Sequence, residues 1–177
     1  MKYCSNCGAK IKFGPVEGES LPRYYCETCH TIHYQNPNMI VGCLPRWEDQ
    51  VLLCKRAIEP RKDYWTLPAG FLEIGEDVAE GAVRETVEEA NAEVDLVGLF
   101  AVYSLRKIGQ VYLMFLADLK NLNFHPGPES SDVRLFKRED IPWDEIAFSA
   151  VRFTLESYFS APADANGRVY LGTHSSK

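Results

Sequence analysis

Long apolar runs are missing from this sequence of 177 residues. A membrane-spanning helix needs about 18 or more consecutive apolar residues, and no such stretch exists. The first ten residues, MKYCSNCGAK, lack the apolar run of a secretion signal, and nothing before the first cysteine resembles a transit peptide. We therefore expect a soluble, cytoplasmic protein without a membrane partner.

An excess of positive charge is missing as well. The sequence has 19 Lys and Arg against 25 Asp and Glu, which gives a formal net charge of −6. Proteins that bind nucleic acid or anionic lipid usually present a basic surface, so a nucleic-acid partner is not expected. Internal repeats and low-complexity tracts are also absent. With 46% hydrophobic residues, the chain can bury one good core and carry a small appendage.

Four of the six cysteines form two C-x-x-C pairs near the N-terminus, Cys4 with Cys7 and Cys26 with Cys29. Without a secretion signal, they are expected to remain thiols. Two tight turns that each present two thiolates complete a tetrahedral four-sulfur shell suited to zinc. A structural zinc would also explain how residues 1–35 fold with so few apolar side chains. We predict a zinc ribbon there; four unrelated reduced cysteines are the alternative.

The other cysteines and the nearby histidines do not indicate a second metal site. Cys43 and Cys54 lie in predicted strands and are expected to behave as small buried apolar residues. His30 and His33 could replace a thiolate, but with four cysteines present we expect them to be ordinary polar residues of the ribbon. Zinc ribbons bind nucleic acid, bind proteins or extend a fold. Because this one is barely basic, we expect a structural or homodimer-forming extension.

From residue 36 onward, the pattern of apolar strands and amphipathic helices is typical of an α/β domain. The expected strands are 39–45, 50–56, 94–106, 110–119 and 133–137, and the expected helices are 77–91 and about 144–159. Asp77 is a good N-cap, since Glu80 follows three residues later. The expected apolar stripe of that helix comprises Val78, Ala82, Val83, Thr86, Val87 and Ala90. We assign residues 36–160 to the main domain and 161–177 to a tail that crosses over as an extended strand.

Three glutamates of the first helix are spaced for metal binding. Glu85, Glu88 and Glu89 stand at i, i+3 and i+4, so their carboxylates share one face within a single turn. Like charges this close repel each other, and Arg84 is the only basic residue between positions 70 and 92. Oxygen ligands arranged in this way suit a divalent cation such as Mg²⁺ or Mn²⁺, which offsets the repulsion. A merely solvated acidic face is the alternative.

The order of residues around these glutamates resembles the signature box of the Nudix hydrolases, in which a loop-helix-loop binds catalytic metals. The matching positions are Gly70, Glu76, Arg84, Glu85, Glu88 and Glu89. The resemblance implies an α/β/α sandwich with a mixed sheet, here preceded by the small N-terminal zinc ribbon. Departures from the box are mild: Asn91 replaces a glycine, and Thr86 and Ala92 take aliphatic positions. Asn tolerates the left-handed conformation that is expected at a helix end.

The resemblance also implies roles for individual residues. Glu85 and Glu89 would be the principal metal ligands, Glu88 a further ligand or proton acceptor, and the Ala69 carbonyl an additional ligand. Arg84 would orient the glutamates rather than touch substrate. Divalent metals in such a site polarise a bridging phosphate and lower the pKa of a bound water that attacks phosphorus. The expected reaction is hydrolysis of a nucleoside diphosphate linked to another group.

Residues outside the box indicate which subgroup of the Nudix hydrolases this sequence resembles. The motif S-Q-P-W-P-F-P of the NADH pyrophosphatases is absent, whereas "YQNPNMIVGCLP", "WTLPAGFLEIGE" and "GPES" resemble ribbon-bearing FAD and ADP-ribose pyrophosphatases of plants. This implies cleavage of FAD or ADP-ribose to AMP plus FMN or ribose 5-phosphate. The alternatives are a Nudix hydrolase of NADH or dinucleoside polyphosphates, and a non-catalytic sensor of ADP-ribose-type ligands with a zinc-ribbon interaction module.

Residues outside the helix are also candidates for the site. The general base is either a helix glutamate or Glu129, which lies in the long loop "HPGPESSD" where a residue can close over substrate. Arg56 could supply positive charge to the diphosphate, and Trp65 and Tyr112 could stack on adenine or flavin. The ordinary interpretations are an exposed turn glutamate, a solubilising arginine and two core aromatics. The number of catalytic metals is left open.

Overall fold

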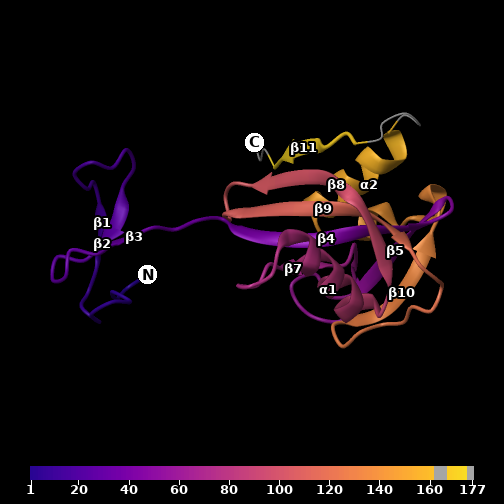
Figure 1. Cartoon of the computed structure of the whole chain (residues 1–177), viewed down its shortest axis with the longest axis horizontal. Helices are drawn as coiled ribbons and strands as arrows, with labels where there is room; N and C mark the ends of the chain where they lie inside the picture. Colours follow the sequence, from indigo (N-terminus) through magenta and orange to yellow (C-terminus); the bar gives the residue numbers. More distant parts are fainter. Residues whose placement is uncertain (162–166, 175–177) are drawn as a thin grey trace. The chain divides into compact units, whose positions relative to one another are not determined.

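The chain folds into two units, which comprise residues Met1–Asn36 and Pro37–Lys177 (Figure 1). Both are seen in a computed structural model, which describes residues 1–161 and 167–174. The first unit holds a small antiparallel sheet of β1 (Lys12–Gly14), β2 (Arg23–Tyr25) and β3 (Ile32–His33). Strands this short need an additional source of stability, because a small sheet without a core is marginal in water.

A mixed sheet forms the centre of the second unit (Figure 1). Its strands are β4 (Asn38–Trp47), β5 (Gln50–Arg56), β6 (Trp65–Thr66), β7 (Ala69–Phe71), β8 (Val94–Leu105), β9 (Gln110–Leu119), β10 (Ser130–Phe136) and β11 (Tyr170–Thr173). Their order is β10-β5-β4-β9-β8-β11, with β6 paired to β5 and β7 paired to β4. β4 and β9 are parallel, as are β8 and β11, and the other described pairs are antiparallel.

Two helices cover opposite faces of this sheet. α1 (Val78–Ala90) packs Ala82 and Ala90 into a core cluster with strand residues that include Val41 and Leu52. α2 (Ser149–Ser160) packs Val151 into a second cluster on the other face. The predicted α/β/α sandwich with a mixed sheet is therefore confirmed. None of the helices in the described part of the chain is long and apolar enough to cross a membrane.

The ends of α1 follow from its sequence. Asp77 accepts hydrogen bonds from the backbone N–H groups of Ala79 and Glu80, at 2.8 and 2.9 Å, and the Glu80 carboxylate accepts one from the Asp77 N–H at 2.9 Å. This capping box satisfies backbone donors that the first helical turn leaves free. At the other end Asn91 adopts the left-handed conformation, with φ 47° and ψ 32°. Both predicted caps are confirmed.

We expect Asp77→Ala to lower the free energy of unfolding of the second unit by about 1 kcal/mol, since it removes the N-cap acceptor. Urea denaturation monitored by tryptophan fluorescence measures the change. Glu93→Ala is the control, because it removes an exposed carboxylate beyond the helix. Equal stability of the two variants would contradict the assigned role of the cap.

The second helix begins later than predicted. Trp143–Glu145 is a short 3-10 turn, and α2 starts at Ser149 instead of residue 144. Between them the chain is extended, because the Ala147 N–H donates to the Trp65 carbonyl at 2.9 Å and Ile146 bridges to the same residue. Ile146 and Ala147 are both buried. Pairing with β6 therefore outweighs the local helical pattern of this segment.

The predicted apolar stripe of α1 is wrong at one position, since Val87 is 44% exposed. The buried face passes instead through Glu85 and Glu89. Cys43 and Cys54 are fully buried, as predicted. Within the predicted tail, β11 pairs in parallel with β8, so this part of the tail joins the sheet. Residues 162–166 and 175–177 of that tail lie outside the described residues.

Candidate active site

The three glutamates of α1 do not share one environment. Glu85 and Glu89 are buried, at 9% and 8% exposure, whereas Glu88 is exposed. The spacing of i, i+4 places Glu85 and Glu89 on the same side of the helix. That side packs against β7, and Glu88 projects toward solvent. The three carboxylates therefore differ in burial, and metal binding by all three stays a prediction.

The backbone of β7 forms a cradle for the two buried carboxylates. The Ala69 N–H donates to Glu89 Oε2 at 3.2 Å. A Cβ atom on Gly70 would lie 2.3 Å from Glu85 Oε1, so only glycine allows this close approach. β7 is held in turn by pairing with β4, where a Cβ on Gly42 would lie 2.3 Å from the Ala69 Cβ. Gly42 was not predicted as a site residue, although a glycine inside a predicted strand often marks a close approach of two backbones.

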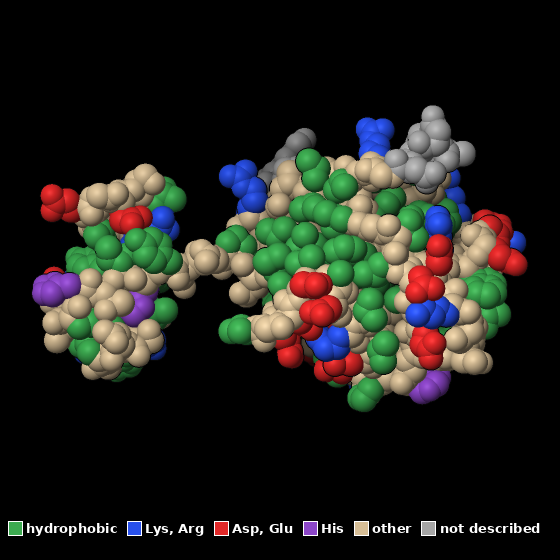
Figure 2. Space-filling model, viewed as in Figure 1, with side chains coloured by type: hydrophobic (Ala, Val, Ile, Leu, Met, Phe, Trp, Pro, Cys, Tyr) green, Lys and Arg blue, Asp and Glu red, His purple; other side chains and the backbone are tan. Residues whose placement is uncertain are grey.

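Arg84 connects the carboxylates that surround it. Its Nη1 atom lies 2.7 Å from Glu85 Oε1 and 3.1 Å from Glu88 Oε2. Its Nε and Nη2 atoms hold Glu76 at 2.9 and 2.8 Å, and Nη2 also donates to the Phe71 carbonyl. Figure 2 shows acidic side chains gathered around a basic one in the region of α1 and β7. With its donors occupied in this way, Arg84 is placed to orient the glutamates.

The buried carboxylates are electrostatically unfavourable without a cation. Burial raises the pKa of Glu89 to about 8, and burial also raises the pKa of Glu85 despite the nearby Arg84. The negative charge of Glu129 raises both pKa values further, and the positive charge of Arg56 lowers that of Glu89. Main-chain contacts bring the loop of Glu129 to this helix, since the Gly127 N–H donates to the Glu89 carbonyl at 3.0 Å. Together these groups form a site whose chemistry suits a divalent cation.

Glu129 and Arg56 come together because β5 and β10 are paired. Ser130 is the register partner of Arg56, and the Ala57 N–H donates to the Glu129 carbonyl at 2.8 Å. The Arg56 side chain is half-buried, with its guanidinium over the Phe148 ring and a hydrogen bond to the Pro60 carbonyl. The sheet thus brings together two predicted residues that are 73 positions apart in sequence, and the loop that carries Glu129 reaches the C-terminus of α1 through Gly127.

Trp65 and Tyr112 lie in the core. Trp65 is 5% exposed and packs edge-to-face on Phe136, and Tyr112 is 7% exposed in the same cluster. The structure gives both rings a packing role. Substrate contact by either ring remains a prediction.

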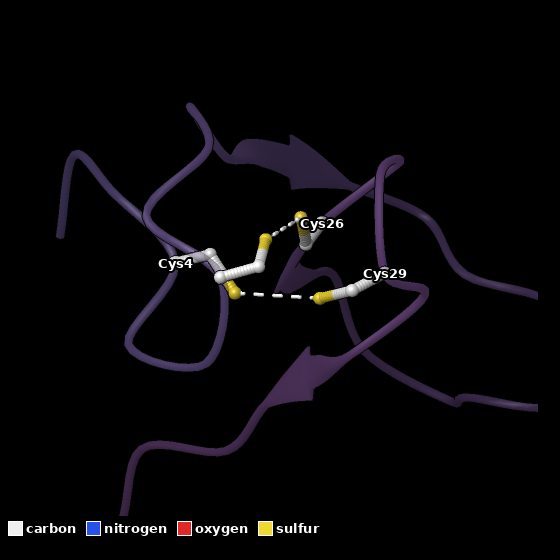
Figure 3. Close-up of side chains that lie close together, drawn as sticks. Cys4, Cys26 and Cys29 are labelled. Atoms are coloured by element: carbon white, nitrogen blue, oxygen red, sulfur yellow. Dashed lines mark hydrogen bonds between the residues drawn. The ribbon is translucent and has the colours of Figure 1, made fainter.

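The four ribbon cysteines converge on one point. Their sulfur atoms all lie within 4.8 Å of one another, with Cys4 and Cys29 at 3.6 Å and Cys7 and Cys26 at 3.5 Å (Figure 3). This is the arrangement that a single tetrahedral metal requires. Among the described residues no second group of three or more His, Cys, Asp or Glu brings its ligand atoms this close together.

Polar groups surround the ribbon sulfurs. His33 is buried and its Nε2 lies 3.3 Å from Cys4 Sγ. Hydrogen bonds from Thr31 lower the pKa of the Cys29 thiol to about 5, which favours the thiolate that a metal needs. His33 was expected to be an ordinary polar residue of the ribbon, and it lies against Cys4, one of the four candidate ligands. Such outer contacts fix the orientation of metal ligands.

We expect Arg84→Gln to weaken metal activation about 10- to 100-fold, the usual effect of losing a residue that orients metal ligands. Arg84 hydrogen bonds also lower the pKa of Glu76 to about 2, so this carboxylate should titrate at higher pH in the variant. Magnesium titration of activity and carboxyl NMR give the two measurements. Arg106→Gln, an exposed arginine after β8, is the control. An unchanged activation constant would exclude the orienting role.

The sandwich, the buried carboxylates and the cysteine cluster define a class of protein, a hydrolase domain that carries a metal-binding ribbon. The NUDIX domain model matches residues 37–154, and the model described as Nudix N-terminal, a zinc ribbon, matches residues 2–35. The chain therefore belongs to the Nudix hydrolase family, and the predicted family and enzyme class are confirmed.

Several known proteins are similar to this chain in sequence or structure. A crystal structure of a NUDIX hydrolase from Nitrosomonas europaea is 52% identical, with a TM-score of 0.93 over 99% of this chain and 100% of the other. The NAD-capped RNA hydrolase NudC of Photorhabdus laumondii is 30% identical over 72% of this chain and 48% of its own length. An ADP-ribose pyrophosphatase of Methanocaldococcus jannaschii is 29% identical over 65% of this chain and 69% of its own length. The chain thus spans about half the length of the NudC relatives that it matches.

Proposed function

We propose that this protein hydrolyses the pyrophosphate bond of a nucleoside diphosphate linked to another group, in a reaction that depends on Mg²⁺ or Mn²⁺. The burial of Glu85 and Glu89 against the glycine cradle of β7 carries the proposal. Burial of carboxylates disfavours their ionised form unless a cation is near, and Arg84 is shared among three carboxylates. The donor set fits a divalent cation, which prefers oxygen ligands.

Each residue of the site has a proposed role. Glu85, Glu89, Glu88 and the Ala69 carbonyl would hold the cation, and Arg84 would orient the glutamates. When bound, the cation would supply positive charge to the phosphates and lower the pKa of a water. Glu129 would accept a proton from the water that attacks phosphorus, and the P–O bond to the leaving phosphate would break. Arg56 would bind the diphosphate, since it stands opposite Ser130, the neighbour of Glu129, and its positive charge lowers the pKa of Glu89.

We propose ADP-ribose and FAD as substrates, which would yield AMP plus ribose 5-phosphate or FMN. The relative from Methanocaldococcus jannaschii is named an ADP-ribose pyrophosphatase, which supports the first. The names of the NudC relatives favour a second candidate, an NAD-type nucleotide. All three compounds contain an adenosine diphosphate group, so the same site could cleave each. The absence of the S-Q-P-W-P-F-P motif weighs against a dedicated NADH enzyme.

For the ribbon, we propose one structural zinc held by its four cysteines. The convergence of four sulfurs within 4.8 Å supports this proposal. A homodimer formed through the ribbon remains a prediction that sedimentation analysis would test. A nucleic-acid partner is disfavoured by the net charge of −6.

Incubation of the purified protein with Mg²⁺ and separate nucleotides tests the function. The panel contains ADP-ribose, FAD, NADH, diadenosine polyphosphates and nucleoside triphosphates, and chromatography measures AMP release. We expect the highest kcat/KM on ADP-ribose or FAD and no turnover in EDTA. No turnover of any compound would contradict the proposal, and a preference for NADH would support the second candidate.

A further inference from the structure

The loop that follows β9 folds back onto the C-terminus of α1. The His125 N–H donates to the Ala90 carbonyl at 2.9 Å, and the Gly127 N–H donates to the Glu89 carbonyl at 3.0 Å. A Cβ atom on Gly127 would lie 1.8 Å from the Glu88 carbonyl oxygen, so the two backbones are in direct contact. The last carbonyls of a helix have no partner within it. The N–H groups of the loop supply the missing donors, at the end of the helix that carries the candidate metal ligands.

Asn91 adds a side-chain link between the same two segments. Its Nδ2 lies 3.2 Å from the His125 carbonyl oxygen and 3.4 Å from that of Pro126. Its backbone is left-handed, a conformation that glycine adopts at least as easily. The Nudix box has glycine here. The asparagine therefore keeps the helix end and contributes two hydrogen bonds that glycine cannot form.

The loop continues directly to Glu129. The Ser130 N–H donates to the Gly127 carbonyl at 3.1 Å, and the Glu129 carbonyl accepts from the Ala57 N–H at 2.8 Å. Glu129 is therefore fixed through its carbonyl to the residue that follows β5, and through Gly127, two residues earlier, to α1. Its side chain is exposed, and Gly127, two residues earlier, lies against the backbone of Glu88 and Glu89.

We propose that Asn91 is a positioning residue that clamps residues 125–129 onto the C-terminus of α1 and thereby fixes Glu129 beside the catalytic centre. This inference rests on the proposed function, in which Glu129 accepts the proton. Two weak hydrogen bonds at the helix end place a general base that lies 38 residues further along the chain. The clamp is specific to asparagine, because its amide donates to both carbonyls at once.

Asn91→Gly tests the clamp without straining the helix end, since glycine accepts the left-handed conformation. We expect kcat on the best substrate to fall about tenfold, as loss of two modest hydrogen bonds allows. The magnesium activation constant should stay unchanged, because the ligands themselves are untouched. Hydrogen exchange should become faster at the Gly127, Ser130 and Ala57 amides. Asn123→Gly, which loosens the same connection outside the clamp, is the control and should leave kcat unchanged.

A double variant shows whether Asn91 acts through Glu129. Glu129→Gln alone should lower kcat strongly, and addition of Asn91→Gly should cause no further loss. Independent, multiplicative losses would overturn the proposal, and so would full activity of Asn91→Gly or of Glu129→Gln. If the wild-type protein cleaved no nucleotide, the proposed function would fail. The exchange rates would still report on the clamp by themselves, and unchanged rates in Asn91→Gly would reject it.

Discussion

Glu89→Gln should abolish metal-dependent turnover while leaving the fold at least as stable as that of the wild type. The carboxylate is proposed as a principal ligand, and loss of one such charge in a buried site is expected to reduce kcat by about a thousandfold. Glutamine keeps an acceptor for the Ala69 N–H and has nearly the same shape. It also removes an ionisable group whose charged form burial makes unfavourable, since the Glu89 pKa is raised to about 8.

Opposite effects on activity and stability would distinguish a functional residue from a structural one. Product release in Mg²⁺ and thermal melting in EDTA measure the two effects. Glu93→Gln, an exposed glutamate just beyond α1, is the matched control and should change neither. Wild-type turnover by Glu89→Gln would remove the helix from the mechanism. A large fall in melting temperature would show instead that the ionised carboxylate stabilises the fold.

Removal of zinc should unfold residues 1–36 and leave the second unit folded. Structural zinc in small modules contributes about 10–16 kcal/mol of apparent free energy at pH 7, far more than three short strands provide. The few buried side chains of this unit include Cys4, Cys26 and His33, and two of these are proposed ligands. Without a metal, the unit therefore has almost no core.

Metal analysis and NMR test this expectation together. The purified protein should contain about one zinc per chain, and a chelator should collapse the amide dispersion of the ribbon signals only. Cys26→Ser should lose the metal, whereas Cys54→Ala, a change in the buried strand β5, should retain it. A metal-free ribbon with dispersed signals, or zinc retained by Cys26→Ser, would refute the four-cysteine assignment.

Local signals in the sequence predicted a large part of the fold. The caps of α1 at Asp77 and Asn91 depend on backbone chemistry within a few residues, and both were correct. The start of the second helix was wrong because Ile146 and Ala147 pair with a strand that is some 80 residues away. Periodicity within a segment carries no information about such a partner.

In the candidate site, too, local sequence predicted some features, and contacts between distant segments decided others. Spacing identified Glu85, Glu88 and Glu89 as a group, but it could not show that Glu88 points to solvent. Gly127 was not predicted as a functional residue. It lies between two prolines in the loop that carries Glu129, a position that can indicate a close backbone approach. Its reason lies in a backbone contact with Glu88 that only the folded chain creates.

The sequence by itself determined the two cysteine pairs, the Nudix box and the limits of α1, because each depends on residues that are near neighbours along the chain. Only the tertiary structure decided which carboxylates are buried against β7, that Trp65 and Tyr112 belong to the core, and that the loop carrying Glu129 caps α1. These features arise from contacts between distant segments. Burial and hydrogen bonding across the fold, rather than spacing, set the environment of each group.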